Sequence, residues 1–385
     1  MFQSKCLEFD TISLQHEKFS KKRFKKNFVR NWHHLDIPNP FPRLVCCWRY
    51  YGSTRPGATR CLLFPGQASQ YVGMCKDLYD AIPSVKNLLD ETDECLGYSL
   101  TNIINFKLFK YTKFKSEIKK NDVMLGHSLG ELTALYAAGY FEKENNLKKE
   151  ESWKNALKLV ECRAKAMNKC CNKDNQCMYA IIGAKLEWIK EIIEKECKIK
   201  ENNSYIINIA NINSSKQIVI SGNNEIIKKV INKILLLNQQ SKSIRILMIN
   251  TSGAFHSNLM KPSINYLKDY INENKQIFNF NINNSKNDII FNLNAKRYKS
   301  IEIINNQILE DLLCNQLISS VLWNDSIIKC LKDGITDFIE IGPKRILSSL
   351  VLQIAQEQGF QKDQLRIYNI DKIEDFNQIK KLFSF

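Results

Sequence analysis

The alternation of apolar and polar positions changes character near residue 59. Residues 1–58 contain a basic and aromatic run, EKFSKKRFKKNFVRNWHH, in which apolar residues follow neither a helical nor a strand period. From Thr59 onward, short apolar runs alternate with longer segments in which apolar residues recur every three or four positions. Because buried strands that alternate with amphipathic helices indicate an α/β fold with a parallel sheet, we expect such a body from residue 59.

The first part of this body contains two expected buried strands, Cys61–Phe64 and Val123–Leu125. Between them, the stretch DLYDAIPSVKNLLDETDECLG has the apolar spacing of a helix. Further helices are expected at 129–138, which is rich in Ala and Leu, and at 152–170. Near the C-terminus, SIIKCLKDG and ITDFIEIG are expected to return to the same sheet as a helix and a strand.

A compact pattern of six short elements lies between these two parts. The expected elements are, in order, strand 177–183, helix 186–197, strands 205–211 and 217–222, helix 225–238 and strand 243–249. The order β-α-β-β-α-β is typical of a ferredoxin-like unit. We therefore expect a disordered leader (1–58), an α/β body (59–176 and 250–385) and a small ferredoxin-like subdomain (177–249) inserted into that body.

Composition supports a folded chain with a distinctive leader. The 385 residues are 44% hydrophobic and 25% charged, as in globular proteins, and half of the net charge of +16 falls in residues 1–60, which hold twelve Lys and Arg against four Asp and Glu. A basic, acid-poor N-terminal segment is typical of an organelle transit peptide, and a basic arm that binds nucleic acid is the alternative. We expect import into a plastid-type organelle (an apicoplast) or a mitochondrion, with the cytoplasm as the alternative location. No RNA-reading motif or zinc finger is present, and no apolar run reaches the roughly 18 residues of a membrane span, so we expect neither nucleic acid nor a membrane span.

The thirteen cysteines show no spacing typical of a disulfide framework. Four of them cluster without a nearby histidine or a paired C-x-x-C: Cys162, Cys170, Cys171 and Cys177. A metal site is the alternative there, but reduced thiols in a reducing compartment explain the pattern better. We expect no metal.

The first candidate for chemistry is Ser128, in the sequence Gly126-His127-Ser128-Leu129-Gly130. This sequence fits G-x-S-x-G between a strand and a helix, which is the context of a nucleophile elbow. The glycines permit a sharp turn, and the field of the helix N-terminus favours negative charge on the serine oxygen. The alternative is a small residue in an ordinary turn.

A serine nucleophile needs a base, and His256 is the remaining histidine after those of the leader and the elbow are set aside. It lies in a glycine-containing loop, NTSGAFHSNLMKP, where a surface or helix-capping role is the alternative. The loop FPGQASQ offers backbone N–H groups for an oxyanion, or is a plain connection. Arg163 lies on an apolar helical face, where it is either a surface cation with a buried stem or a fork for a carboxylate.

Seven motifs occur in the order and approximate spacing of one known family. They are FPGQASQYVGM, GHSLGE, VECRAKAM, INSSKQIVISG, AFHSNLMKP, QLISSVLW and FIEIGPKRILSSL. From about Thr59 to about Ile354 the chain resembles the malonyl-CoA:acyl carrier protein transacylases. The resemblance implies an α/β-hydrolase-like body with the ferredoxin-like unit in its usual place.

The resemblance also implies a role for each matching residue. Ser128 is similar to the family's acyl-accepting nucleophile, His256 to its base, and Gln316 to the residue whose backbone carbonyl orients that base. The backbone N–H groups of Gln67 and Leu129 would form the oxyanion hole, and Arg163 would bind the free carboxylate of malonate. Phe255 resembles the form of its motif that accepts malonyl rather than methylmalonyl groups.

The implied activity is ping-pong transfer of a malonyl group from malonyl-CoA to acyl carrier protein, which supplies fatty-acid biosynthesis. The expected partners are malonyl-CoA and an acidic acyl carrier protein that brings its own phosphopantetheine, so no cofactor of the enzyme itself is expected. A monomer is expected.

Two alternatives remain open at this point. The first is a serine hydrolase or esterase on an α/β scaffold. The second is a catalytically impaired relative, because about 25 residues stand between LGYSL (96–100) and GHSLGE where the family has roughly twice as many. Ala68, Lys344 and Arg345 also depart from the usual motifs.

Overall fold

The computed structural model describes ten stretches of the chain: residues 59–67, 69–71, 74, 76–99, 118–141, 152–198, 206–238, 243–274, 287–299 and 306–383. All of them belong to one compact unit, Arg55–Phe385. The predicted leader and most of the shortened stretch before the elbow lie outside the described residues, as does Ala68.

A six-stranded sheet forms the centre of this unit, with the strand order β10-β9-β1-β2-β7-β8. Five strands run parallel and β8 is antiparallel to β7. The strands are β1 (Arg60–Phe64), β2 (Val123–Gly126), β7 (Asp288–Ile290), β8 (Arg297–Tyr298), β9 (Asp337–Ile341) and β10 (Arg366–Ile370). Every residue of β1, β2 and β9 is buried, as in parallel sheets that are covered on both faces.

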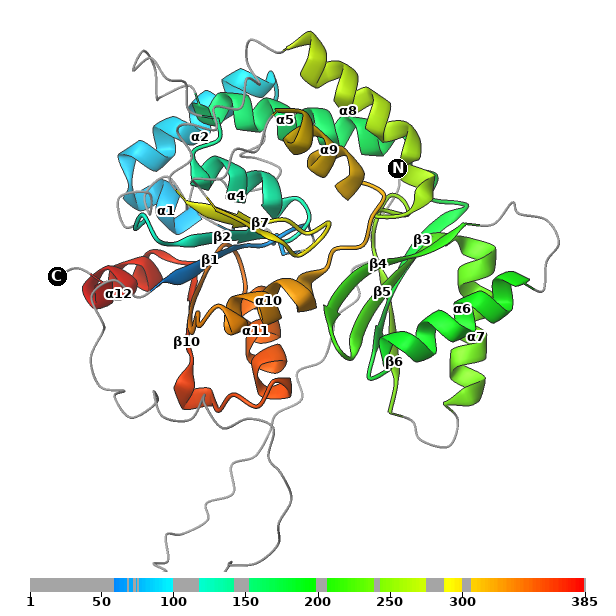
Figure 1. The fold of residues 1–385 in the computed structure, drawn as a ribbon. Helices are drawn as coiled ribbons and strands as arrows, with labels where there is room; N and C mark the ends of the chain where they lie inside the picture. The colour runs from blue at the N-terminus through cyan, green and yellow to red at the C-terminus, as the bar shows by residue number, and fades with distance from the viewer. Residues whose placement is uncertain are drawn as a thin grey trace, which may run out of the picture. The chain divides into compact units, whose positions relative to one another are not determined.

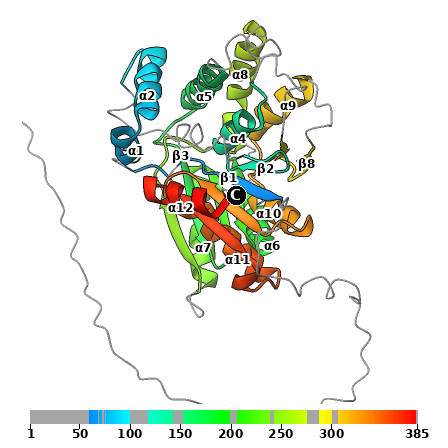
Figure 2. The ribbon, with the colours of Figure 1, turned by 90° about the vertical axis from the view of Figure 1, so that its left-hand side faces the viewer.

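Helices cover both faces of this sheet (Figures 1 and 2). On one face lie α4 (Gly130–Ala138), α5 (Ser152–Lys169), α8 (Lys261–Glu273) and α9 (Asn306–Gln316); on the other lie α10 (Trp323–Lys332) and α11 (Ile346–Glu357). Leu62 and Phe64 enter the core of the first face, and Cys61 and Leu63 enter that of the second. Successive residues of a strand point to opposite faces of the sheet, so the one short apolar run of β1 contributes side chains to both cores.

The helical stretch predicted between the first two strands is two helices, α1 (Lys76–Ala81) and α2 (Pro83–Leu96). Ile82 between them is extended, with φ −130° and ψ 103°, and Pro83 occupies the first turn of α2. A proline disfavours helical geometry in the residue before it, which is why the apolar period continues while the helix does not. The C-terminal helix α12 (Ile373–Phe383) follows β10.

A second sheet has four strands in the order β4-β5-β3-β6, and each adjacent pair is antiparallel. The elements along the chain are β3 (Gln176–Ile182), α6 (Leu186–Lys198), β4 (Ile207–Ser214), β5 (Gln217–Asn223), α7 (Asn224–Leu237) and β6 (Arg245–Ile249). Strand β4 extends three residues beyond the predicted end, so the turn before β5 shortens to Ser215 and Lys216. Helices α6 and α7 share an apolar core with this sheet.

The edge strand β4 connects the small sheet to the large one. The N–H of Ile212 donates to the carbonyl of Val321 (3.0 Å), and the N–H of Val321 donates to the carbonyl of Ala210 (2.8 Å). Val321 precedes α10, so a backbone bridge joins β4 to the covering layer of the six-stranded sheet. The two sheets thereby face a common space at the carboxyl end of β2.

Candidate active site

Ser128 lies in the sharp turn between β2 and α4, with a backbone φ of 52°. This left-handed conformation is uncommon for a residue with a side chain and is typical of strained functional turns. Both flanking glycines are sterically required. A Cβ on Gly126 would meet Gly130 at 2.0 Å, and a Cβ on Gly130 would meet the carbonyl oxygen of Phe64 at 1.9 Å.

Asn292, just after β7, holds this turn from outside. The backbone N–H of Ser128 donates to its Oδ1 (2.7 Å), and its Nδ2 donates to the carbonyl of Gly126 (2.6 Å). The side chain is fully buried, so both hydrogen bonds are shielded from water. The sequence gives no signal for this role, because Asn292 is far along the chain from the elbow and outside the seven motifs.

His256 is the hydrogen-bond partner of Ser128, with 2.7 Å between Oγ and Nε2. The other ring nitrogen, Nδ1, lies 2.9 Å from the carbonyl oxygen of Gln316 and 3.1 Å from that of Ser319. Carbonyl oxygens only accept, so Nδ1 carries the hydrogen and the neutral ring accepts the serine proton at Nε2. The structure therefore brings Ser128, His256 and Gln316 together in one chain of hydrogen bonds.

The environment of His256 keeps its ring neutral. Burial, and after it the nearby positive charge of Arg163, lower the pKa of His256 to about 3, although the hydrogen bond to Gln316 acts in the opposite direction. A neutral imidazole at physiological pH is the form that accepts a proton.

Arg163, on α5, lies beside the nucleophile with only 3% of its surface exposed. Its Nη2 donates to Ser128 Oγ (3.2 Å) and to Gln316 Oε1 (3.0 Å), while its Nε is buried without a hydrogen-bond partner among the described residues. Burial lowers the pKa of Arg163 to about 10, so the guanidinium stays charged at neutral pH. The interpretation of Arg163 as a surface cation is therefore wrong, because the charged head itself is buried.

Glu131, within the motif GHSLGE, is a second buried titratable side chain, and the sequence does not indicate a role for it. It is 0% exposed, its Oε1 accepts from Gln316 Nε2 (2.8 Å), and its Oε2 accepts from the backbone N–H of Asn292 (2.6 Å). Burial raises the pKa of Glu131, whereas these two accepted hydrogen bonds and the nearby charge of Arg163 lower it and favour the ionised carboxylate.

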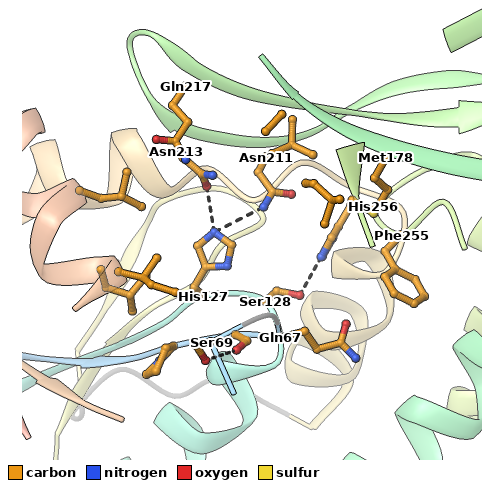
Figure 3. A pocket seen from close by; sticks show the side chains of 18 of the residues that line it. Gln67, Ser69, His127, Ser128, Met178, Asn211, Asn213, Gln217, Phe255 and His256 are labelled. Carbon is orange, nitrogen blue, oxygen red and sulfur yellow. Dashed lines mark hydrogen bonds between the residues drawn. The ribbon is translucent and has the colours of Figure 1, made fainter. Parts of the chain in front are cut away.

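A cavity of about 210 Å³ opens over Ser128 and His256. Figure 3 shows Ser128 with Gln67 on one side and His256 on the other, and Phe255 beside His256 in the wall. The opposite wall belongs to the four-stranded sheet, through Met178, Ala180, Asn211, Asn213, Gln217, Val219 and Ile249. Leu129 is not part of this wall. It stands between Ser128 and the first residue of α4, and its side chain packs against the core of the first face.

His127 links the elbow to the small sheet. Its Nε2 lies 2.9 Å from Asn213 Oδ1 and 3.5 Å from Asn211 Nδ2, both on β4 (Figure 3). Its ring also packs against Trp323, with 5.3 Å between centroids. The elbow is thus held on three sides, by β4, by α10 and by Asn292.

Within the ranges that the structure describes, no group of three His, Cys, Asp or Glu side chains is arranged to hold a metal ion. The clustered cysteines of 162–177 are free thiols there. None of the helices in the described part of the chain combines the length and the apolar character that a bilayer crossing requires.

Comparison with known proteins gives consistent relatives. The malonyl CoA-acyl carrier protein transacylase of Bacillus subtilis (strain 168) is 32% identical over 311 residues, which cover 76% of this chain and 89% of the relative. The polyketide biosynthesis malonyl CoA-acyl carrier protein transacylase PksC of the same organism is 30% identical over 315 residues, covering 77% of this chain and 96% of PksC. No family model matches the chain.

Among solved structures, the crystal structure of MCAT from Streptococcus pneumoniae superposes with a TM-score of 0.67 at 25% identity, covering 84% of this chain and 99% of that one. The alignments to the two sequence relatives cover nearly the whole length of each relative, and the solved structure shares the α/β fold. The chain belongs to the malonyl CoA-acyl carrier protein transacylase family.

Proposed function

We propose that the chain transfers a malonyl group from malonyl-CoA to the phosphopantetheine thiol of acyl carrier protein and so supplies malonyl-acyl carrier protein for fatty-acid biosynthesis. The observation that carries this proposal is the Ser128–His256 pair at 2.7 Å with the buried Arg163 guanidinium 3.2 Å from the same serine oxygen. A nucleophile and base next to a buried cation suit a thioester whose acyl group ends in a carboxylate.

In the first half-reaction, Ser128 Oγ attacks the thioester carbonyl of malonyl-CoA while His256 Nε2 takes the hydroxyl proton. The resulting oxyanion lies between the backbone N–H groups of Gln67 and Leu129. The C–S bond then breaks, the CoA sulfur takes the proton from His256, and a malonyl ester remains on Ser128.

In the second half-reaction, the thiol of phosphopantetheine attacks the ester carbonyl and gives its proton to His256. The C–O bond to Ser128 breaks, and the serine oxygen takes that proton back. The enzyme returns to its starting state, which makes the order ping-pong. The carbonyl of Gln316 holds the ring through Nδ1 in both halves, so Nε2 alone exchanges protons.

Arg163 selects the acyl group in this scheme. The Nε–H has no hydrogen-bond partner in the part of the chain that the structure describes and would donate to the malonyl carboxylate, and a buried guanidinium fork binds a carboxylate more strongly than an exposed one. Phe255 in the cavity wall limits space near the acyl carbon, which suits malonyl better than a branched group.

The test is an intact-mass measurement after mixing the protein with malonyl-CoA. We expect a malonyl adduct on the wild type and none on Ser128→Ala, with circular dichroism confirming that the variant is folded. A wild type that never forms the adduct would sink the transferase proposal. It would also support the impaired alternative, whose shortened stretch lies mostly outside the described residues.

The hydrolase alternative fits the site less well. A Ser–His–acid triad places a carboxylate on Nδ1 of the histidine, whereas Nδ1 here faces two backbone carbonyls. A hydrolase also has no use for a buried arginine beside its nucleophile. If the malonyl ester on Ser128 is hydrolysed to free malonate faster than its malonyl group is transferred to acyl carrier protein, the result would favour the hydrolase interpretation.

The finer description of the architecture also belongs to this proposal. The strand–elbow–helix arrangement on a parallel sheet supports an α/β-hydrolase-like body, and the antiparallel order β4-β5-β3-β6 with α6 and α7 supports a ferredoxin-like subdomain.

We also propose that the protein is a monomer in solution, and light scattering measures this.

The location of the enzyme is a proposal drawn from charge. The net charge of +8 in residues 1–60 supports import into a plastid-type organelle or a mitochondrion through residues 1–58. A fusion of residues 1–58 to a fluorescent protein should enter an organelle; diffuse cytoplasmic signal would favour the alternative.

A further inference from the structure

The proposed reaction steps leave a buried carboxylate close to the nucleophile without a role. Glu131 lies in the first turn of α4, three residues after the nucleophile, and it touches neither Ser128 Oγ nor His256. Burying a carboxylate is costly unless hydrogen bonds and charges around it compensate. Its position under the elbow therefore needs an explanation.

The two oxygens of Glu131 bind different parts of the site. Oε2 accepts from the backbone N–H of Asn292, whose side chain clamps the turn around Ser128. Oε1 accepts from the side-chain Nε2 of Gln316. The carboxylate thus connects the nucleophile side of the site with the residue that orients His256.

Gln316 makes contacts with its backbone and its side chain separately. Its backbone carbonyl accepts from His256, its Nε2 donates to Glu131 and to the carbonyl of Ser128 (3.1 Å), and its Oε1 accepts from Arg163 Nη2. A carboxamide has two orientations that differ by exchange of oxygen and nitrogen. In the other orientation, the NH₂ group would face the Arg163 donor and the oxygen would face the carboxylate.

We propose that Glu131 is a positioning residue that sets the orientation of the Gln316 carboxamide and through it fixes the Arg163 guanidinium for carboxylate recognition. This inference rests on the proposed function, because it assigns a cause to the choice of a malonyl group. A carboxylate only accepts hydrogen bonds, so it forces Gln316 Nε2 toward itself and leaves Oε1 for Arg163. Arg163 Nη2 is then held, and its buried Nε, which has no hydrogen-bond partner among the described residues, is left for the incoming carboxylate.

The charge of Glu131 acts in the same direction. It opposes the loss of the Arg163 proton that burial favours, and so helps keep a cation in a site with little water. An uncharged side chain of the same shape would lose both effects, the amide orientation and the compensating charge.

The test uses Glu131→Gln, which keeps size and shape. The new amide can place its oxygen toward the fixed N–H of Asn292, which leaves its NH₂ toward Gln316 and turns that carboxamide round. We therefore expect kcat/KM for malonyl transfer to fall about 10- to 100-fold, as for other small losses of alignment, while acetyl transfer changes little. The selectivity ratio of malonyl over acetyl should fall by nearly the same factor.

A second variant shows whether Glu131 acts through Gln316. Gln316→Met keeps the backbone carbonyl for His256 and removes the carboxamide, so it should lower the same ratio. In the double variant the two losses should not multiply, because the carboxylate has nothing left to orient. Equal losses of malonyl and acetyl transfer in E131Q, or independent losses in the double variant, would overturn the proposal.

Glu340 provides the matched control. It is also 0% exposed, but its oxygens accept from the backbone N–H groups of Leu347 and Ser348 at the start of α11 and not from Gln316 or Asn292. E340Q should lower Tm and leave the selectivity ratio unchanged. If E131Q fails to fold, Glu131 serves the stability of the fold and the proposal is wrong. A wild type without a malonyl adduct would instead count against the proposed function itself.

Discussion

The two residues that carry the proposed chemistry share an uncommon backbone conformation. Ser128 has φ 52° and His256 has φ 59°, and neither is glycine. Such conformations cost about 1–3 kcal/mol each and persist only where surrounding contacts fix them. Asn292 supplies those contacts at Ser128, and the hydrogen bond from Nδ1 to Gln316 secures the His256 ring.

Arg163 influences the base as well as the substrate, and this gives a prediction about pH. Its positive charge lowers the pKa of His256, and the protonated ring cannot accept the serine proton. In Arg163→Met the pKa of His256 rises toward 6.5, so the acid limb of Ser128 acylation should move to higher pH. The measurement is the pH dependence of acylation by acetyl-CoA, which does not require the arginine fork.

Lys165→Met is the control for this prediction. Lys165 lies on the same helix, but its side chain is 69% exposed and paired with Glu161, so solvent screens its charge from His256. The acid limb of Ser128 acylation in Lys165→Met should coincide with that of the wild type. Identical limbs in R163M and the wild type would show that burial alone sets the pKa of His256.

Sequence alone predicts only part of this site. Ser128 and His256 can be found because their side chains are chemically distinctive and sit in recognisable motifs. The partner on Nδ1 of His256 is a backbone carbonyl, which every residue type possesses, so only the resemblance to a family pointed to Gln316. A glutamate in the first turn of a helix is ordinarily a solvated side chain, so nothing marks Glu131 as fully buried.

At the scale of elements, the elbow depends on close contact between α4 and two strands. Gly130 lies against the backbone of Phe64 in β1, and Gly126 at the end of β2 lies against Gly130. No side chain fits between these backbones. The two glycines of G-x-S-x-G are therefore needed for the close packing of β1, β2 and α4 as well as for the conformation of the turn.

Gly130→Ala should destabilise the fold by about 3 kcal/mol, because its Cβ meets backbone that cannot move aside. Gly359→Ala is the comparison: Gly359 has φ +86° after α11 but open space around it, so the cost should be about 1 kcal/mol of backbone strain. Urea unfolding at equilibrium measures both changes. Similar losses in the two variants would mean that the turn conformation, and not the packing, matters at Gly130.

Element prediction succeeded where a period was long or a run was fully apolar, as in β1, β2 and α5. It failed to divide α1 from α2, because the hydrophobic pattern continues through a proline that ends one helix and starts the next. The strands β7, β8 and β10 and the helices α9, α11 and α12 were not predicted.

At the scale of the whole described unit, the cavity exists because two sheets meet. The nucleophile comes from the parallel sheet, and much of the opposite wall comes from β3, β4, β5 and β6. The division of the chain into a leader, a body and an inserted subdomain stays a prediction. The sequence indicated both sheets but not the bridge from β4 to Val321, since a contact between distant segments leaves no local pattern.

Residues 55–385, produced without the segment before them, should fold cooperatively and form the malonyl adduct at the wild-type rate. The reason is that the described core clusters and the whole Ser128 site lie within this unit. Thermal unfolding and the intact-mass assay measure the two properties. A shortened chain that folds but forms no adduct would assign a catalytic contribution to residues 1–54.

The double duty of Gln316 has a consequence for how such enzymes diversify. Its backbone carbonyl, which orients the base, is inherited unchanged whatever amino acid is encoded at that position. Its carboxamide, which holds Arg163, is lost with a single codon change. Acyl preference can therefore drift at this position in a lineage while the transfer chemistry is preserved, and a new substrate range does not require a new nucleophile or base.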